Sequence, residues 1–203
     1  MTKYIEPVSP ETIDRVVAVL TGNGIEALHV KTGEEARMRV LEMIPEGSEV
    51  MTMTSVTNES IGLEKELNES GRYKPVRDRF AAGDMTPSDK RKLGAGPDFA
   101  TGSVHALTES GQLVIASQSG SQLPAYAYGA GKMIWVVGAQ KIVPDLDAAM
   151  ERINNYVLGL ESQRANKAYN ITTGSSVNKL LIINKESKMG RAVVVIVDEV
   201  LGF

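Results

Sequence analysis

The sequence contains no cysteine and only two histidines, His29 and His105, in 203 residues. The missing thiol excludes disulfides, thiolate zinc sites, iron–sulfur clusters ligated by this chain and a cysteine nucleophile. Neither histidine lies in HExxH or another metal-ligand spacing, and a lone histidine is more often structural. We therefore predict no transition-metal site, whereas a magnesium site built from carboxylates stays open.

Membrane and nucleotide-binding signatures are missing as well. No apolar run approaches the ~20 residues that span a bilayer, and the first residues lack the basic and apolar regions of a signal peptide, so we expect a cytoplasmic protein without membrane contact. There is no GxSxG elbow and no GxGxxG after a strand, and Met133 stands where a Walker lysine is followed by Ser or Thr. The net charge of −3 argues against a nucleic-acid partner.

Length and composition are those of one ordinary α/β domain. A hydrophobic content of 42% and a charged content of 23% are typical of a globular protein, and 203 residues bury a sizeable core. We find no repeat, low-complexity tract or linker. The sequence therefore predicts a single domain over residues 1–203.

Helical and strand patterns alternate along the chain. Capping residues and apolar spacing predict helices over residues 10–22, 34–44, 58–71, 88–93, 123–130 and 146–160. Short Val/Ile-rich runs predict strands over residues 25–30, 49–54, 99–101, 113–116, 133–137, 180–184 and 192–197. This alternation predicts βαβ crossovers, and hence an α/β fold with an open, mostly parallel sheet and helices on both faces.

A hydroxyl-rich loop follows the expected strand 49–54. It carries Ser55 and Thr57 and leads into a helix that we expect Asn58 to cap. Free backbone N–H groups at such a helix start suit an anion such as phosphate or carboxylate. Ordinary N-capping without a ligand explains the same residues equally well.

Small polar residues also follow two other expected strands. Because the carboxyl ends of parallel strands meet at one edge of a sheet, we predict a ligand crevice there. Lys141 adds a cation that suits an anionic ligand. Besides the hydroxyl-rich loop, the candidate ligand-binding residues are Thr101, Gly102 and Ser103 after strand 99–101, Ser119, Gly120, Ser121 and Gln122 after strand 113–116, and Lys141.

The turn Thr108-Glu109-Ser110-Gly111 places a carboxylate just before an apolar strand. If the crevice covers it, Glu109 can act as a nucleophile or base, although glutamates in turns are usually just solvated. The most basic segment, residues 74–92, also contains three aspartates, so we interpret it as a solvated region. Tyr126 and Tyr128 lie on adjacent helix faces, and we expect at least one to pack in the core.

The chain resembles the LUD (lactate-utilisation) domain family along nearly its whole length. The resemblance rests on Gly24-Ile25-Glu26-Ala27, Glu34-Glu35-Ala36, Ile44-Pro45-Glu46-Gly47, the stretch from Ser55 to Leu63, Thr101-Gly102-Ser103, Ala106 and Glu109-Ser110-Gly111. It implies the fold of ribose-phosphate isomerases and CoA transferases. It also implies a role in lactate or related organic-acid metabolism, with a small anionic metabolite bound in the crevice.

Two alternatives stay open under this resemblance. CoA transferases use a glutamate from a Glu-x-Gly turn to form a thioester with CoA, and Glu109-Ser110-Gly111 is similar to that turn. The chain would then be an acyl/CoA-transfer or sugar-phosphate isomerase enzyme that uses Glu109, with CoA or a phosphorylated ligand. Alternatively it is an accessory subunit or scaffold without catalysis of its own. Iron–sulfur oxidoreductase chains and a second copy of this chain are the protein partners that the resemblance suggests.

The C-terminal third departs from the short lactate-utilisation subunit. That subunit usually carries Ser-Gly-Pro-Ser, Thr-Ala-Asp-Ile-Glu and a later His-Gly-Pro. The corresponding segments here are 173–179 and 188–191, which lack both the acidic pair and the histidine. The resemblance therefore extends to the family more firmly than to that subunit's own task.

Overall fold

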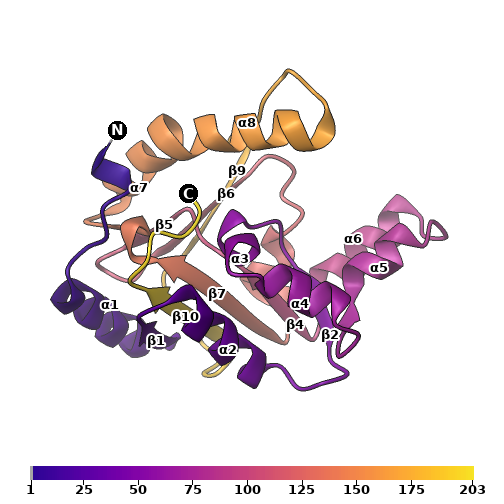
Figure 1. The fold of residues 1–203 in the computed structure, drawn as a ribbon, viewed down its shortest axis with the longest axis horizontal. Helices are drawn as coiled ribbons and strands as arrows, with labels where there is room; N and C mark the ends of the chain where they lie inside the picture. Colours follow the sequence, from indigo (N-terminus) through magenta and orange to yellow (C-terminus); the bar gives the residue numbers. More distant parts are fainter. Residues whose placement is uncertain (1) are drawn as a thin grey trace.

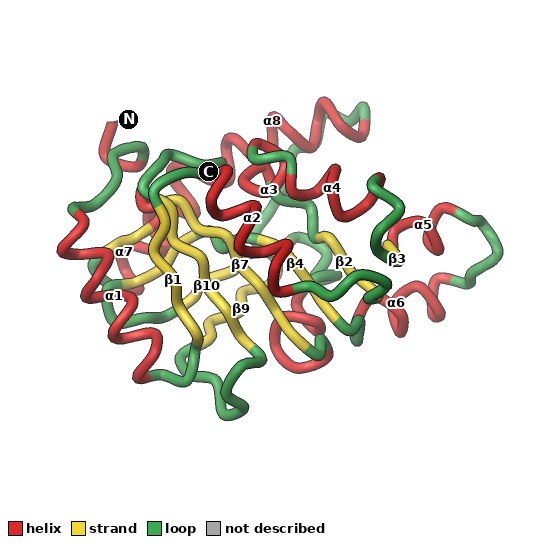
Figure 2. Tube along the Cα trace, turned by 60° about the horizontal axis from the view of Figure 1, so that its bottom comes forward, coloured by secondary structure: helices red, strands yellow, loops and turns green. Residues whose placement is uncertain are grey.

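A computed structural model describes residues 2–203 and places a six-stranded, all-parallel sheet at the centre of the molecule (Figure 1). The predicted α/β class with an open parallel sheet is confirmed. In spatial order the strands are β1 (Glu26–Val30), β10 (Ala192–Val197), β7 (Lys132–Gly138), β4 (Phe99–Gly102), β2 (Glu49–Thr52) and β3 (Lys74–Pro75). Figure 2 shows the strands from β1 to β2 side by side.

A second, mixed sheet packs beside the first. Its order is β8 (Ile142–Val143), β5 (Ala106–Thr108), β6 (Leu113–Ser117) and β9 (Lys179–Ile183). The sequence-based placement of residues 113–116 in the parallel sheet is therefore wrong, because β6 runs antiparallel to both of its neighbours. Only residues 109–112 connect β5 to β6, which is enough for a hairpin but too short for a parallel crossover.

The two faces of the parallel sheet are covered differently. Helices α2 (Gly33–Met43) and α4 (Leu63–Glu69) cover one face, whereas α1 (Pro10–Gly22) and the second sheet cover the other. Strand β7 shows the alternation that this requires. Met133, Trp135 and Val137 enter the core shared with α1, and Ile134 and Val136 enter the core shared with α2. Burial on both faces explains why β7 and β10 read as continuous apolar runs.

A long helical segment covers the outer face of the second sheet. It consists of α7 (Leu146–Arg152), the π-helical segment η4 (Ile153–Val157) and α8 (Leu158–Tyr169), so it extends beyond the expected residue 160. The Asp145 carboxylate accepts the Ala148 N–H at 2.9 Å and caps its start, as predicted. Figure 1 shows α8 along the top of the molecule.

The helix expected from Asn58 is instead two short helices. Ser55, not Asn58, caps α3 (Val56–Ser60), because its hydroxyl accepts the Asn58 N–H at 3.2 Å. Gly62 then adopts a φ of 72°, which only glycine tolerates easily, and separates α3 from α4. The remaining helical elements are η1 (Thr2–Tyr4), α5 (Val76–Ala81), α6 (Pro87–Ala95), η2 (Ala125–Gly129) and η3 (Ala139–Lys141). No helix within residues 2–203 has the length and apolarity that crossing a membrane requires.

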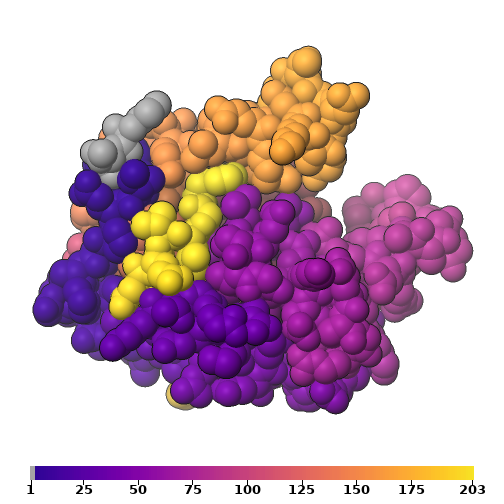
Figure 3. Space-filling model, viewed as in Figure 1, coloured from indigo at the N-terminus to yellow at the C-terminus, as the bar shows by residue number. Residues whose placement is uncertain are grey.

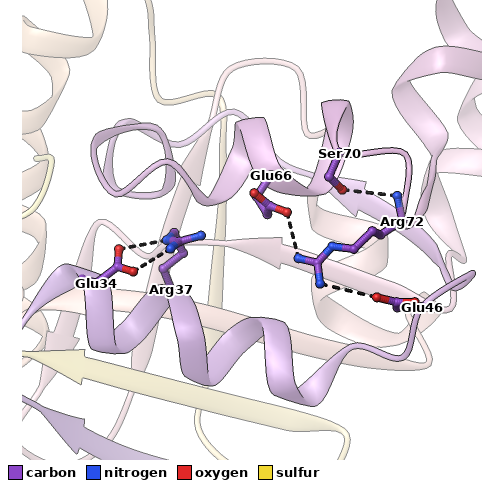
Figure 4. A network of polar contacts seen from close by, with 6 residues as sticks. All are labelled: Glu34, Arg37, Glu46, Glu66, Ser70 and Arg72. Carbon is purple, nitrogen blue, oxygen red and sulfur yellow. Dashed lines mark hydrogen bonds and ion pairs between the residues drawn. The ribbon is translucent and has the colours of Figure 1, made fainter.

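Polar contacts on the outside of the α2–α4 layer join neighbouring segments (Figure 4). Arg72 pairs with Glu66 at 2.8 Å and with Glu46 at 3.5 Å, and Arg37 pairs with Glu34 within α2. Such solvent-exposed pairs contribute little to stability. The layer is therefore held mainly by its apolar face.

Candidate functional site

The site lies where the direction of the sheet connections changes. After β2 the chain crosses the face covered by α4 to reach β3, whereas after β4 it crosses the opposite face into the second sheet. In open α/β sheets, ligands bind at the carboxyl ends of the strands at such a switch point. A cleft of 380 Å³ occupies this position, between the loops after β2 and β6 and helix α8. A smaller inner pocket of 50 Å³ adjoins it and shares Thr54, His105, Gln122, Glu161 and Arg164 with it.

The walls of the outer cleft combine apolar and hydroxylated side chains. The apolar part comes from Met51, Met53, Phe80, Ile153, Val157 and Leu158, and the polar part from the loop after β6 with Ser175 and Ser176. The inner pocket is bounded on one side by Phe203, which belongs to the C-terminal segment that Figure 3 shows beside α3. A volume of this order suits a small metabolite.

Lys141 reaches into the inner pocket from η3, directly after β7. Its side chain is 1% exposed. The Nζ atom donates to Thr57 Oγ1 at 2.9 Å, to Ser103 Oγ at 3.1 Å and to the Val104 carbonyl at 3.2 Å.

These three contacts suit the ammonium form of Lys141. The Thr57 hydroxyl donates its own hydrogen to the Leu201 carbonyl at 3.1 Å, and Ser103 donates to the Val136 carbonyl at 2.7 Å. Both hydroxyl oxygens therefore accept from Lys141, as the Val104 carbonyl must. Three acceptors match the three hydrogens of an ammonium group.

No carboxylate compensates this charge. Within the described residues, Lys141 Nζ contacts only neutral oxygens. Burial and the nearby charge of Arg152 lower the pKa of Lys141 well below its usual value. A protein that places a buried ammonium group among neutral acceptors leaves a position where an anion is favourable.

Arg152, at the end of α7, is a second buried cation. It is 0% exposed and donates to the His105 carbonyl at 2.7 Å, and its guanidinium faces the Tyr156 ring at 5.4 Å. Its Nε and second terminal nitrogen have no hydrogen-bond acceptor within the described residues. Burial lowers the pKa of Arg152 to about 10, so the group is charged at neutral pH.

His105 follows β4 and lines both the cleft and the inner pocket. Its Nδ1 accepts the backbone N–H of Ala116 at 3.1 Å. Burial, together with the charges of Lys141 and Arg152, lowers the pKa of His105 to about 3. The imidazole is therefore neutral at physiological pH.

Two arginines stand in the wall of the outer cleft. Arg164 on α8 donates two 2.7 Å hydrogen bonds to Glu161, which raise the pKa of Arg164. Arg77 on α5 donates to the Thr52 carbonyl at 2.8 Å and to Thr54 Oγ1 at 3.1 Å. With Lys141, the lining contains three cations and one carboxylate, in a chain whose net charge is −3. The local charge is thus opposite in sign to that of the whole protein.

Tyr126 on η2 completes the inner pocket. Its ring packs edge-on against Trp135 with centroids 5.5 Å apart, and its hydroxyl lies against Gly102, where a Cβ would collide with it. The hydroxyl has no hydrogen-bond partner within the described residues, and burial raises the pKa of Tyr126. It is consequently a protonated donor beside the pocket.

Most of the predicted ligand-binding residues lie at this edge. Ser55, Thr57, Ser103 and Lys141 line the inner pocket, and Ser119, Ser121 and Gln122 line the outer cleft. Three other predicted residues, Asn58, Thr101 and Gly102, are buried but line neither space. Gly120 belongs to the lining loop but packs on the Lys179 side chain.

Glu109 does not join this cluster, which corrects our expectation. Its side chain is 43% exposed and lies 3.7 Å from Arg15 on α1, and the adjacent Gly111 packs against Val19 and Asn23. The cause is the end of β6 at which Glu109 lies. Glu109 precedes the start of that strand, whereas the cleft is lined by its other end, at Ser117.

Sequence reasoning missed several lining residues. Arg77 lies in the segment that we interpreted as solvated, and His105 was assigned a structural role. Glu161 and Arg164 carry no motif, because only the packing of α8 over the second sheet brings them here. Within residues 2–203 there is no group of three or more side chains that could hold a metal ion.

Comparison with known proteins finds one matching family profile. The sequence profile of the LUD domain matches residues 13–198. A DUF162 family protein from Deinococcus radiodurans has a similar structure, with a TM-score of 0.57 and 13% identity over 94% of this chain and 99% of that chain. No protein of curated function matches the sequence.

Two ribose-5-phosphate isomerases are more distant structural matches. The enzyme from Neisseria gonorrhoeae gives a TM-score of 0.36 at 12% identity, over 70% of this chain and 57% of that chain. A second isomerase, in complex with phospho-erythronic acid, gives 0.40 at 14% identity, over 74% and 76%. At these scores neither match carries an argument about the site.

Proposed function

The chain belongs to the LUD domain family, and from this premise we propose that it binds a small anionic metabolite of lactate or related organic-acid metabolism in the cleft. The observation that carries the proposal is the buried Nζ of Lys141, whose three hydrogen bonds to neutral oxygens suit an ammonium charge and which contacts no carboxylate within the described residues. Burying such a charge is costly unless a counter-charge accompanies it. A carboxylate or phosphoryl group of the ligand would supply that counter-charge.

The sizes of the two spaces suit a small ligand that has one charged head group. The inner pocket of 50 Å³ accommodates one charged head group beside Lys141, and the 380 Å³ cleft accommodates the rest of a small molecule. Arg77 and Arg164 at the cleft raise the local positive potential and attract an anion from solution. The Met53 and Phe80 side chains offer apolar contact to a short carbon chain.

The enzyme alternative through Glu109 gains no support from the geometry. A nucleophile or base must come within hydrogen-bond reach of the reacting atoms, and Glu109 lies at the opposite end of β6. The accessory-subunit alternative predicts that no small anion binds. Association with an iron–sulfur oxidoreductase chain or with a second copy stays a prediction.

A thermal-shift panel tests the proposal. Sulfate, phosphate, lactate, pyruvate and CoA are each titrated into the parent protein and into Lys141→Met. We expect at least one anion to raise the melting temperature of the parent, because a ligand that binds only the folded state stabilises it. Lys141→Met should weaken that binding roughly 10- to 100-fold, the usual loss for a hydrogen bond to a charged group.

Lys132→Met is the matched control. Lys132 stands at the amino end of β7, 4.0 Å from Glu26 and away from the cleft, so its removal should leave the anion response unchanged. If no anion shifts the parent, or if both lysine variants respond like the parent, the proposed function is wrong.

A further inference from the structure

His105 is held from three sides. Lys141 donates to the Val104 carbonyl at 3.2 Å, and Arg152 donates to the next carbonyl, that of His105, at 2.7 Å. Each of the two buried cations thus binds one of two consecutive backbone carbonyls in the segment after β4. The third contact is to the ring itself, where the Ala116 N–H donates to Nδ1 at 3.1 Å. Both the backbone and the ring of His105 therefore have one favoured orientation.

The contact to Ala116 determines where the ring carries its proton. A backbone N–H only donates, so Nδ1 must offer a lone pair, and the hydrogen of a neutral ring lies on Nε2. Nε2 has no hydrogen-bond partner within the described residues, and the ring lines both the cleft and the inner pocket. The ring therefore brings an uncommitted N–H donor to the lining of the space where the proposed ligand lies.

The groups around His105 keep it in this state. Lys141 from η3 and Arg152 from α7 are both cationic and oppose a third positive charge. On the α8 side, the Glu161 carboxylate is bonded to Arg164 through two 2.7 Å contacts and does not bond His105. The Tyr126 hydroxyl is also a donor. Within the described residues, none of these groups accepts a hydrogen bond from the ring that would stabilise an imidazolium.

We propose that His105 is a specificity-determining residue of the cleft, a neutral imidazole locked with its hydrogen on Nε2 that donates to an acceptor oxygen of the bound anion. This inference rests on the proposed anion-binding function and names the chemistry that the ligand must present. The ligand needs a carbonyl, carboxylate or phosphoryl oxygen beside its anchored charge. A ligand with an ammonium group there is rejected by the donor and by the two cations. Pyruvate should therefore bind and alanine should not.

Nitrogen-15 NMR of the ligand-free protein tests the state of the ring. The chain contains only two histidines, so the spectrum of a His105→Asn variant assigns both. We expect His105 to show the Nε2–H tautomer and no titration between about pH 5 and 8, while His29 titrates in the same sample as an internal reference. A hydrogen on Nδ1, or an imidazolium forming in this range, would overturn the inference and leave the proposed function standing.

Two substitutions separate the two ring nitrogens. Asparagine at position 105 keeps an acceptor near Nδ1 for Ala116 but has no donor at the Nε2 position. Glutamine reaches the Nε2 position with an amide donor but loses the acceptor. We expect His105→Asn to bind pyruvate and sulfate at least about tenfold more weakly, and His105→Gln to stay within roughly threefold of the parent.

Calorimetric titrations with pyruvate, sulfate and alanine provide the readout, together with the melting temperature of each variant. A purely structural role would instead make His105→Gln, which loses the Ala116 contact, the weaker binder. That result, or equal binding by His105→Asn and the parent, would overturn the donor role. If the parent binds neither pyruvate nor sulfate, the donor role is wrong, whereas the proposed function fails only if no anion of the thermal-shift panel binds; the NMR result still reports the tautomer.

Discussion

Two buried cations at opposite edges of the parallel sheet differ in one respect. Arg191, just before β10 at the amino edge, has a carboxylate partner, since Glu186 lies 2.6 Å away. Lys141, after β7 at the carboxyl edge, has only neutral oxygens around it. The two residues are similarly enclosed, at 8% and 1% exposure. The comparison separates a charge that the fold itself neutralises from one that has no carboxylate partner among the described residues, which is the charge that we propose a bound anion meets.

The ion pair between Arg191 and Glu186 has a structural role. Its guanidinium also donates to the Tyr126 carbonyl at 3.1 Å and approaches the Ala130 carbonyl at 3.4 Å, so it ties η2 to β10. Burial alone would raise the pKa of Glu186, but the hydrogen bonds from Arg191 and the Lys188 N–H lower it. Charge and hydrogen bonds are thus satisfied within the fold.

Tyr126 connects the two regions. Its backbone carbonyl is held by Arg191 at the amino edge, while its hydroxyl lies beside Gly102 and the inner pocket. The structural pair therefore helps to position a donor of the candidate site. We therefore expect a substitution of Arg191 to alter the cleft only by displacing η2.

The largest effect should come from breaking the Arg191 pair. Arg191→Met leaves a buried carboxylate without its partner, which typically costs about 3–5 kcal/mol. Lys141→Met removes a charge that has no partner, so its free energy of unfolding should stay within about 1 kcal/mol of the parent or increase. Urea unfolding of both variants measures the difference. Equal destabilisation of the two would remove the distinction between these sites.

A smaller loss is expected from Gly102→Ala. The new Cβ would meet the Tyr126 hydroxyl, and such overpacking costs about 1–3 kcal/mol. The double variant Gly102→Ala with Tyr126→Phe removes the colliding oxygen and should recover most of this loss. Urea unfolding of the two single variants and the double variant forms the test. Additive losses would show that the two residues do not meet.

The sequence predicts the features that depend on local pattern, and not those that depend on contacts in the packed structure. The strands β7 and β10 and the capped helix start at Asp145 follow from local pattern and were predicted nearly in place. The carboxyl-edge loops were also predicted, because parallel strands bring their ends together. Lys141 could be named only as a cation; its lack of a carboxylate is visible only in the packed structure.

The residues that the sequence analysis misplaced or missed are those whose position local pattern does not determine. Glu109 was placed at the cleft because its turn resembles the Glu-x-Gly turn of CoA transferases, although that turn precedes β6 and the cleft lies at the other end of this strand. Strand β5 was not predicted, and neither, therefore, was the hairpin that it forms with β6. Glu161 and Arg164 lie on α8, about forty residues after Gln122, the nearest predicted site residue apart from Lys141. No local signal relates such a helix to the cleft.

The smallest effect concerns His29, which joins α1 to the segment after β10. It contacts Asp14 at 3.1 Å and Asp198 at 2.6 Å. Burial alone would lower the pKa of His29, but the hydrogen bonds to Asp198 and Asp14 outweigh it and raise the pKa above 6.5. Its stabilisation is therefore fully present below about pH 6.5 and is lost as the pH rises through the folded-state pKa.

His29→Gln should be less stable than the parent by roughly 0.5–1 kcal/mol at about pH 5.5, because both carboxylates are partly exposed. At about pH 8.5 the two proteins should converge. Urea unfolding at the two pH values measures this. A difference that grows with pH would contradict the assigned charge state.

The most direct test of the central claim, that Lys141 anchors an anion, is a calorimetric titration with sulfate across pH. Sulfate keeps its charge across the titrated pH range, so any change in affinity arises from a change in the charge of the protein. Because the pKa of Lys141 is lowered well below its usual value, we predict that affinity falls as rising pH removes the ammonium proton. Lys141→Met should bind sulfate weakly at every pH. Sulfate binding by Lys141→Met that matches the parent in affinity and pH dependence would contradict the claim.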